Sequence, residues 1–250
     1  MARIPIGLQL YSVRKDCEQD VAGTLKAVAE MGYDGVEFAG YYDRSAEELR
    51  KMLDDVGLKV AGSHVGLDVL QGEELAKTVE FNQTLGNTRL VIAWYDPEKM
   101  ATRADIVEFG RALNEVAEKL KPQGMQTGYH NHAHEFKMLD GETGWDILAA
   151  NTNDEVVMQI DLGNAMSGGG DAIAALEKWA DRGYTVHLKE HSSTKEAVVV
   201  GEGDVPWQEV FRICESAGKT EWYIVEQESY AYPPLECVEL CLKNLRGMGK

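Results

Sequence analysis

The segment Gly128–Phe136 concentrates side chains that can bind metals and transfer protons. It holds three of the six histidines in the chain, at the alternate positions His130, His132 and His134. Imidazole groups bind first-row metals and exchange protons near neutral pH. In an extended segment alternate side chains share a face, so we expect the three histidines on one side and Asn131 on the other. This spacing indicates a functional site rather than a polar loop with a chance run of histidines.

Three further ionisable residues each follow a separate apolar, strand-like run: Asp161, His187 and Glu226. With His130 they offer nitrogen and oxygen donors suited to Mn²⁺, Co²⁺, Zn²⁺ or Fe²⁺. Each also has a structural alternative. Asp161 can cap a turn, His187 can be a hydrogen-bonded core residue, and Glu226 can belong to a surface acidic group. Because all four end different runs, a shared site is favoured over four separate structural roles.

Strand-like runs alternate with amphipathic helical patterns along the whole chain. Ser45 and Glu48, for example, form a capping-box pattern at the start of a helix that Gly57 ends. The expected strands are Ile6–Tyr11, Gly35–Phe38, Leu58–Val65, Arg89–Trp94, Met125–Asn131, Val156–Asp161, Tyr184–Lys189 and Trp222–Glu226. The expected helices are Glu18–Met31, Ser45–Val56, Glu73–Leu85, Ala101–Leu120, Trp145–Ala150, Asp171–Asp181, Pro206–Ser216 and Leu235–Leu245.

Eight strand–helix units of about 30 residues predict an α/β fold, a single (β/α)₈ TIM barrel over residues 1–250. The alternative is an open doubly wound sheet, but the glycine-rich first turn usual in such sheets is missing. In a barrel the carboxyl ends of the strands meet at one mouth, which would bring the ionisable residues together. The long connections 133–144 and 190–205 are expected to cover that mouth.

The composition of the chain limits which classes of partner and which compartment are expected. A net charge of −17 argues against nucleic acid and anionic membranes, because the field of the protein repels polyanions. The four cysteines form no CxxC pair, as is typical of reduced thiols. The sequence starts without a signal-type apolar region and has no apolar stretch long enough to cross a bilayer. We therefore expect a cytoplasmic protein.

As a set, several short segments resemble the xylose isomerase-like TIM-barrel family, broadly the sugar phosphate isomerases/epimerases. The resemblance covers essentially the whole chain, and its most specific parts are the HNH segment at 130–132 and the HLK segment at 187–189. The segments that carry it are Gly7–Arg14, Gly35–Phe38, Tyr129–His132, Asp161–Asn164, His187–Glu190, Gly201–Asp204 and Tyr223–Glu226.

The resemblance implies a divalent metal, most often Mn²⁺, with Co²⁺, Zn²⁺, Mg²⁺ or Fe²⁺ as alternatives. Its ligands would be His130, Asp161, His187 and Glu226. Family epimerases use two metal-bound glutamates, one on each side of a keto sugar, to move a proton beside the carbonyl. Glu226 matches one of them. His130 stands where the other is expected, and this departs from the family pattern.

The chemistry requires a base within reach of an acidic C–H and an electrophile for the developing enolate. We expect Glu226 to be the base and Lys189 to hold or protonate a substrate oxygen. Glu135 or His132 would supply a second acid on the opposite face. Further substrate contacts are expected from Tyr11, Glu37, His64, Trp94 and Asn131.

The leading hypothesis is a sugar isomerase or epimerase acting on a small-molecule sugar. With an imidazole in place of one carboxylate, β-elimination or hydration of a 3-keto-glycoside is the alternative. A non-catalytic sugar-binding barrel is a third reading. The fold-related abasic-site endonucleases need a basic groove for DNA, which the acidic balance disfavours. Barrels of this kind often pair, so a homo-oligomer is compatible with the resemblance.

Overall fold

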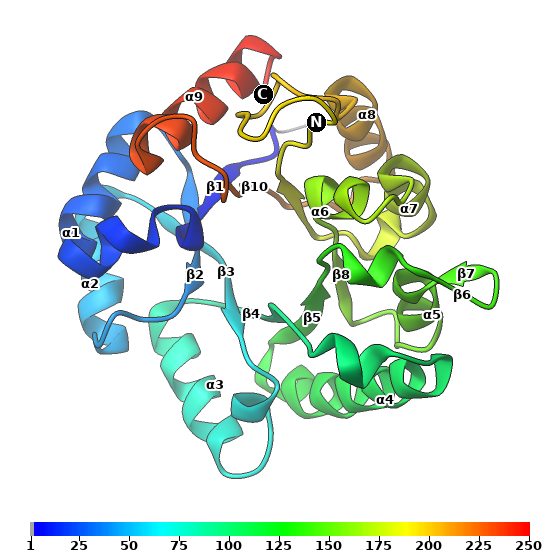
Figure 1. The fold of residues 1–250 in the computed structure, drawn as a ribbon. Coiled ribbons are helices and arrows are strands. Elements are labelled where there is room, and N and C mark those ends of the chain that lie inside the picture. Colours follow the sequence, from blue (N-terminus) through cyan, green and yellow to red (C-terminus); the bar gives the residue numbers. More distant parts are fainter. Residues whose placement is uncertain (1–2) are drawn as a thin grey trace.

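The apolar runs form parallel strands because both of their faces are buried, one in the barrel interior and one under the helices. Residues 3–250 are described by a computed structural model, and within them eight strands form one parallel sheet that curls into a barrel (Figure 1). The strands are β1 (Ile6–Gln9), β2 (Gly35–Ala39), β3 (Lys59–Val65), β4 (Arg89–Ile92), β5 (Gln126–His130), β8 (Val157–Gln159), β9 (Thr185–Leu188) and β10 (Trp222–Val225). The predicted TIM barrel is confirmed.

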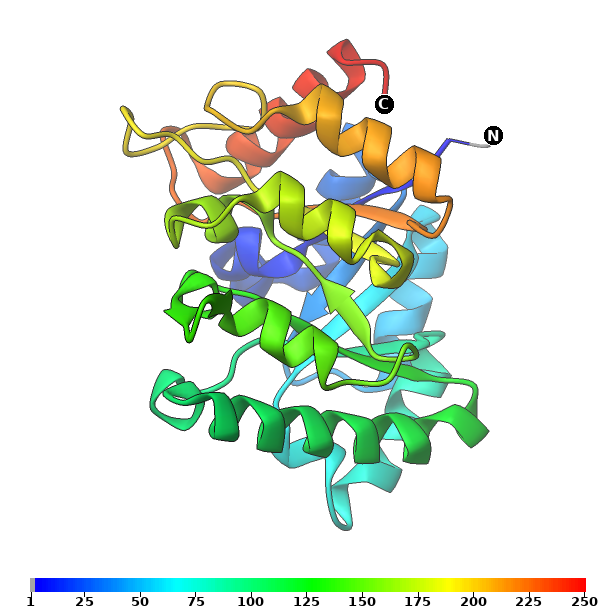
Figure 2. The same ribbon diagram turned by 90° about the vertical axis from the view of Figure 1, so that its right-hand side faces the viewer.

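Helices follow the strands and lie around the outside of the barrel (Figure 2). The predicted capping box is present, since Ser45 and Glu48 each accept the other's backbone N–H at the start of α2. The helices are α1 (Arg14–Met31), α2 (Ala46–Val56), α3 (Glu74–Leu85), α4 (Arg103–Leu120), α5 (Gly144–Ala150), α6 (Leu162–Ser167), α7 (Ala172–Lys178), α8 (Trp207–Ala217) and α9 (Pro234–Gly247).

The sheet runs in the order β8–β5–β4–β3–β2–β1–β10–β9, so β8 and β9 lie at its two ends. One isolated parallel bridge, between Asp161 and His187, joins these ends just beyond β8. There the N–H of His187 donates to the carbonyl of Ile160 at 2.8 Å. The barrel is thus nearly closed, and its seam is made by two of the predicted metal ligands.

Several boundaries differ from the sequence expectation at the mouth of the barrel. The first strand ends at Gln9, because residues 10–13 turn into a 3-10 helix. The connection 133–144 contains a small hairpin, β6 (Met138–Leu139) and β7 (Glu142–Thr143). This hairpin and α6 were not predicted, since elements this short carry no readable periodicity.

No helix among residues 3–250 is both long and apolar enough to cross a membrane.

Candidate active site

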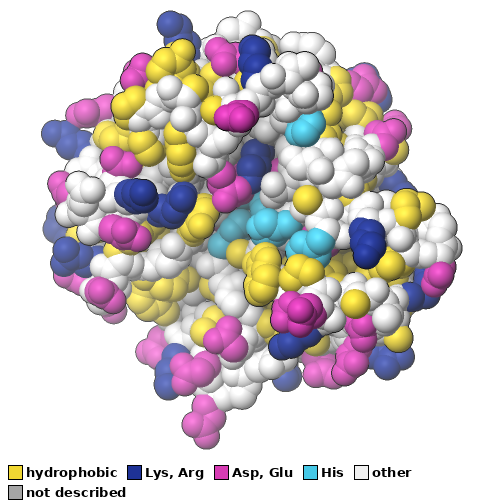
Figure 3. All heavy atoms as spheres, viewed as in Figure 1, with side chains coloured by type: hydrophobic (Ala, Val, Ile, Leu, Met, Phe, Trp, Pro, Cys, Tyr) yellow, Lys and Arg dark blue, Asp and Glu magenta, His cyan; other side chains and the backbone are white. Residues whose placement is uncertain are grey.

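The carboxyl ends of the strands surround a cavity of about 540 Å³. Histidine side chains gather in the central hollow of this face, with acidic and hydrophobic groups beside them (Figure 3). The residues that line the cavity are Tyr11, Ala39, His64, Val65, Gly66, Ala93, Trp94, His130, His132, Glu226 and Glu228. They come from strand ends and strand–helix loops, as expected for a barrel mouth.

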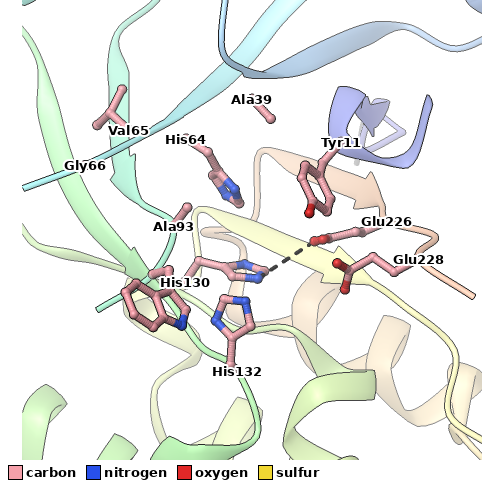
Figure 4. A pocket seen from close by; sticks show the side chains of 11 residues that line it. Tyr11, Ala39, His64, Val65, Gly66, Ala93, His130, His132, Glu226 and Glu228 are labelled. Carbon is pink, nitrogen blue, oxygen red and sulfur yellow. Dashed lines mark ion pairs between the residues drawn. The ribbon is translucent and has the colours of Figure 1, made fainter. Parts of the chain in front are cut away.

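Four of the sequence-predicted residues converge on one point at this mouth. His130, Asp161, His187 and Glu226 each offer a ligand atom, and these atoms lie within 4.8 Å of one another. Nε2 of His130 lies 3.8 Å from Oε2 of Glu226, the pair joined by the dashed line in Figure 4. Nδ1 of His187 lies 2.6 Å from the same oxygen and 4.0 Å from Oδ2 of Asp161. All four residues are buried.

The two oxygens of Asp161 have different surroundings. Oδ1 accepts the N–H of Asn164 at 2.7 Å and so caps α6. Oδ2 is buried and has no hydrogen-bond partner among residues 3–250. Burial raises the pKa of the Asp161 carboxyl to about 7. Because an unpaired buried oxygen is costly, Oδ2 is suited to bind a cation. With the imidazole and carboxylate donors around it, the cluster fits a first-row divalent metal.

Neighbouring groups hold His187 and Glu226 in their charged forms. Burial opposes a charge on His187, but the carboxylates of Glu37 and Glu226 outweigh it and raise its pKa to about 10. Burial also favours the neutral form of Glu226, yet Lys189 and His187 lower the pKa of that carboxyl below its ordinary value. Glu226 is therefore an ionised carboxylate at the cavity floor, available as a ligand or as a base.

His130 has a neutral ring. Burial, together with the charge on the neighbouring His187, lowers the pKa of His130 well below its ordinary value. Its ring centroid is 4.5 Å from that of His187 and 4.8 Å from that of His64. A neutral imidazole is the form that binds metals, so His130 is chemically ready to do so.

Lys189 lies between carboxylates beside the cluster. Its Nζ is paired with Glu228 and lies 4.0 Å from Oε1 of Glu226. Burial disfavours the ammonium, but Asp161 and Glu226 overcome this and raise the pKa of Lys189 above its ordinary value. It is therefore a cation that contacts two lining residues, Glu226 and Glu228, although it is not itself among the residues that line the cavity.

The histidine-rich segment does not present one face of three histidines, and that expectation is wrong. β5 ends at His130, and a 3-10 helix begins at His134, so the alternation of an extended chain stops after the first histidine. His132 still lines the cavity. His134 lies away from it, with Nε2 3.0 Å from Oε1 of Glu135.

Glu135 lies behind the loop rather than on the cavity wall. It is buried, accepts the hydroxyl of Tyr129, and accepts the backbone N–H of His132 at 2.8 Å. Of the two residues expected to supply a second acid, His132 is the one that borders the cavity. Glu135 instead fixes the backbone that carries His132.

The expected substrate contacts divide into two groups. Tyr11 and Trp94 stand at the mouth with 41% and 54% of their surface exposed, and His64 also lines the cavity. Glu37 and Asn131 are fully buried and lie outside the lining. Asn131 accepts the N–H of Asp161 at 2.8 Å and donates to its carbonyl at 3.1 Å, so it links the end of β5 to Asp161.

Two buried amides beneath the cavity were not predicted as site residues. Gln9 and Gln159 both donate to Glu37, at 2.7 and 2.8 Å. Gln159 also accepts from Nε2 of His64 at 2.7 Å. The sequence did offer one signal for them, because each glutamine ends an otherwise apolar strand. A polar group buried at such a position must have hydrogen-bond partners nearby.

Known proteins share this architecture. A solved sugar phosphate isomerase/epimerase from Parabacteroides distasonis superposes with a TM-score of 0.83 at 23% identity, covering 98% of this chain and 94% of the other. The IOLI protein, crystallised with a zinc atom bound, superposes with a TM-score of 0.72 at 14% identity, covering 97% of each chain. At such identities these structures show the fold.

Curated sequences of similar length also match. Rhizopine catabolism protein MocC of Rhizobium meliloti is 26% identical, covering 90% of this chain and 80% of that protein. Inosose dehydratase of Clostridium perfringens is 23% identical, covering 82% and 81%. The family model described as xylose isomerase-like TIM barrel matches residues 25–243. The chain belongs to the xylose isomerase-like TIM-barrel family.

Proposed function

We propose that the protein is a divalent-metal-dependent enzyme that removes a proton from the carbon beside the carbonyl of a small sugar-like ketone. The observation that carries this proposal is the convergence of His130, Asp161, His187 and Glu226 within 4.8 Å, next to a cavity of about 540 Å³. The family supports a sugar-processing enzyme, and relatives named inosose dehydratase and sugar phosphate isomerase/epimerase support ketone chemistry.

The four residues of the cluster would hold the metal, with Mn²⁺ favoured. When bound, a divalent metal acts as a Lewis acid that polarises a substrate carbonyl and makes the adjacent C–H more acidic. Glu226 is the best placed base, because it is ionised and lines the cavity. It would take the proton from carbon on its side of the substrate.

Lys189 and His132 complete the acid–base set. Lys189 is a cation beside Glu226 and would hold the substrate oxygen on which negative charge develops. His132 borders the cavity, and burial lowers its pKa, so its ring is neutral and can exchange a proton near neutral pH. Tyr11 and Trp94 at the mouth would pack against the faces of the sugar.

His132 can act as the acid only after its ring takes up a proton from solvent, and the product depends on where it delivers that proton. Protonation of carbon from the face opposite Glu226 gives an epimer or isomer, the outcome we place first. Protonation of a leaving oxygen gives β-elimination. A histidine at position 130 in place of a carboxylate, together with relatives named inosose dehydratase, favours this second candidate.

Incubation of the Mn²⁺-loaded protein with free ketoses, an inosose and a 3-keto-glycoside in D₂O, followed by NMR, tests the proposal. An epimerase or isomerase gives a product deuterated at the reacting carbon, whereas a lyase gives an unsaturated ketone and the released group. Glu226→Gln should lower the rate by about 10²- to 10⁴-fold. Glu239→Gln, on an exposed residue of α9, should leave it unchanged. The proposal is refuted if Glu226→Gln keeps the wild-type rate, or if none of the ketones reacts.

A further inference from the structure

Glu37 is a buried carboxylate beneath the cavity on which hydrogen-bond donors converge. Its Oε2 lies 2.7 Å from Nε2 of His187, 3.0 Å from Nε2 of His64 and 2.7 Å from the amide nitrogen of Gln9. Its Oε1 accepts the amide nitrogen of Gln159 at 2.8 Å. The side chain is fully buried and borders no part of the cavity, so it cannot contact a substrate.

The barrel is locally shaped around this carboxylate. In the pairing of β2 with β3 the register shifts between Val36 and Glu37, so that Glu37 lies opposite Gly62. A Cβ at position 62 would come within 2.9 Å of Oε1 of Glu37. A glycine and a register irregularity thus leave room for the carboxylate at a point where the strands would otherwise be filled with side chains.

These contacts fix which nitrogen of each histidine carries the hydrogen. An ionised carboxylate only accepts hydrogen bonds, so Nε2 of His187 and Nε2 of His64 must be the donors. Nε2 of His64 faces a second acceptor as well, Oε1 of Gln159 at 2.7 Å. In a neutral ring the lone pair is then on Nδ1. Nδ1 of His187 lies 2.6 Å from Glu226 and 4.0 Å from Asp161, so without a metal it also carries a hydrogen, donated to Glu226. A cation bound by the cluster would take the place of that hydrogen, whereas the one on Nε2 would stay with Glu37.

We propose that Glu37 is a positioning residue that holds His187 and His64 as their Nε2–H tautomers, and so assigns Nδ1 of His187 to the metal. This inference rests on the metal site of the proposed function, and it replaces the expectation that Glu37 contacts substrate. Carboxylate partners of metal-binding histidines orient the ring and strengthen it as a ligand.

The test measures metal binding and tautomers rather than turnover. Titration calorimetry with Mn²⁺ and Zn²⁺ compares wild type with Glu37→Gln, which keeps one acceptor oxygen, and Glu37→Leu, which keeps none. We expect affinity to fall in that order, by about 10- to 100-fold for Glu37→Leu. Asp34→Asn is the matched control. Its carboxylate is on the loop before β2, at the other end of the barrel, where it accepts the guanidinium of Arg3 and the N–H of Ile6. This variant should bind metal as wild type does.

A second measurement needs no variant. Long-range ¹H–¹⁵N NMR of the Zn²⁺-loaded wild-type protein should find the hydrogen of both rings on Nε2 and the metal on Nδ1 of His187. A hydrogen on Nδ1 of His187, or wild-type affinity in a folded Glu37→Leu variant, would overturn the inference and leave the proposed function standing. Wild-type protein that binds neither ion would overturn both.

Discussion

Asp161 has one structural task and one proposed task, one for each of its carboxylate oxygens. Oδ1 caps α6, and the buried Oδ2 has no partner among the described residues. A helix cap alone needs one oxygen and does not require an aspartate to be fully buried. The second oxygen is the part of the residue that a structural role leaves unexplained, and it faces His187 in the cluster.

The substitution Asp161→Asn separates these tasks. Asparagine is as good a cap as aspartate, so we expect little change in stability. Its amide cannot replace an anionic ligand, and we expect Mn²⁺ affinity to fall by at least about tenfold, measured by titration calorimetry. Asp171→Asn is the control, because Asp171 caps α7 through the same kind of bond, outside the cluster. Equal affinities in the two variants would contradict the assignment of Asp161 as a ligand.

Neighbouring strands position the cluster through close backbone contact. β5 carries His130, and β8 leads into Asp161, with Gly128 paired to Val157 between them. A Cβ at Gly128 would come within 2.5 Å of the carbonyl oxygen of Val157 and 2.7 Å of its Cβ. The approach of these two strands therefore requires a glycine at this position.

Gly128→Ala should consequently destabilise the protein. Since β8 must move to admit the methyl group, we expect a loss of about 1–3 kcal/mol in the free energy of unfolding, measured with urea. Gly7→Ala in β1 is the matched control, because there the nearest atoms are 3.5 Å away, an ordinary contact. Equal stability of the two variants would show that β8 adapts without cost.

The sequence predicts elements better than it predicts where strand-end side chains point. Apolar periodicity and caps such as Ser45 are local signals, and they were sufficient for the barrel and for the approximate position of each strand, but not for the residue at which a strand ends. Glu37, Asn131 and Glu135 carry the right chemistry, but they are buried in networks beneath or behind the cavity. Their orientation depends on the β2–β3 register shift and on β5 ending at His130, neither of which leaves a local signal.

At the scale of the whole molecule, the charge of −17 sets a field that disfavours anionic ligands. Lys189, which contacts the lining residues Glu226 and Glu228, is already paired with Glu228. Among the residues that line the cavity, no arginine or lysine is present. A phosphate group on the substrate would therefore find no cationic side chain among the lining residues.

We accordingly expect unphosphorylated sugars to be preferred. For a ketone that is turned over, kcat/KM should exceed that of its phosphate ester by about tenfold or more at low salt, because the field repels the dianion. Part of the difference should disappear as ionic strength rises. A phosphate ester that reacts faster than the free sugar at low salt would contradict this expectation.

Two residues of the cluster, Asp161 and His187, also close the barrel where β8 meets β9. Between β8 and β9 the described backbone is joined by one bridge, from Asp161 to His187, the same residues that bring a carboxylate and an imidazole to the cluster. The side chains of Gln159 and Thr185 add a hydrogen bond of 2.8 Å. Closure of the cylinder and convergence of the four-residue cluster thus depend on the same two residues. A substitution that displaces either strand end is therefore expected both to loosen the wall and to separate the side chains of the cluster.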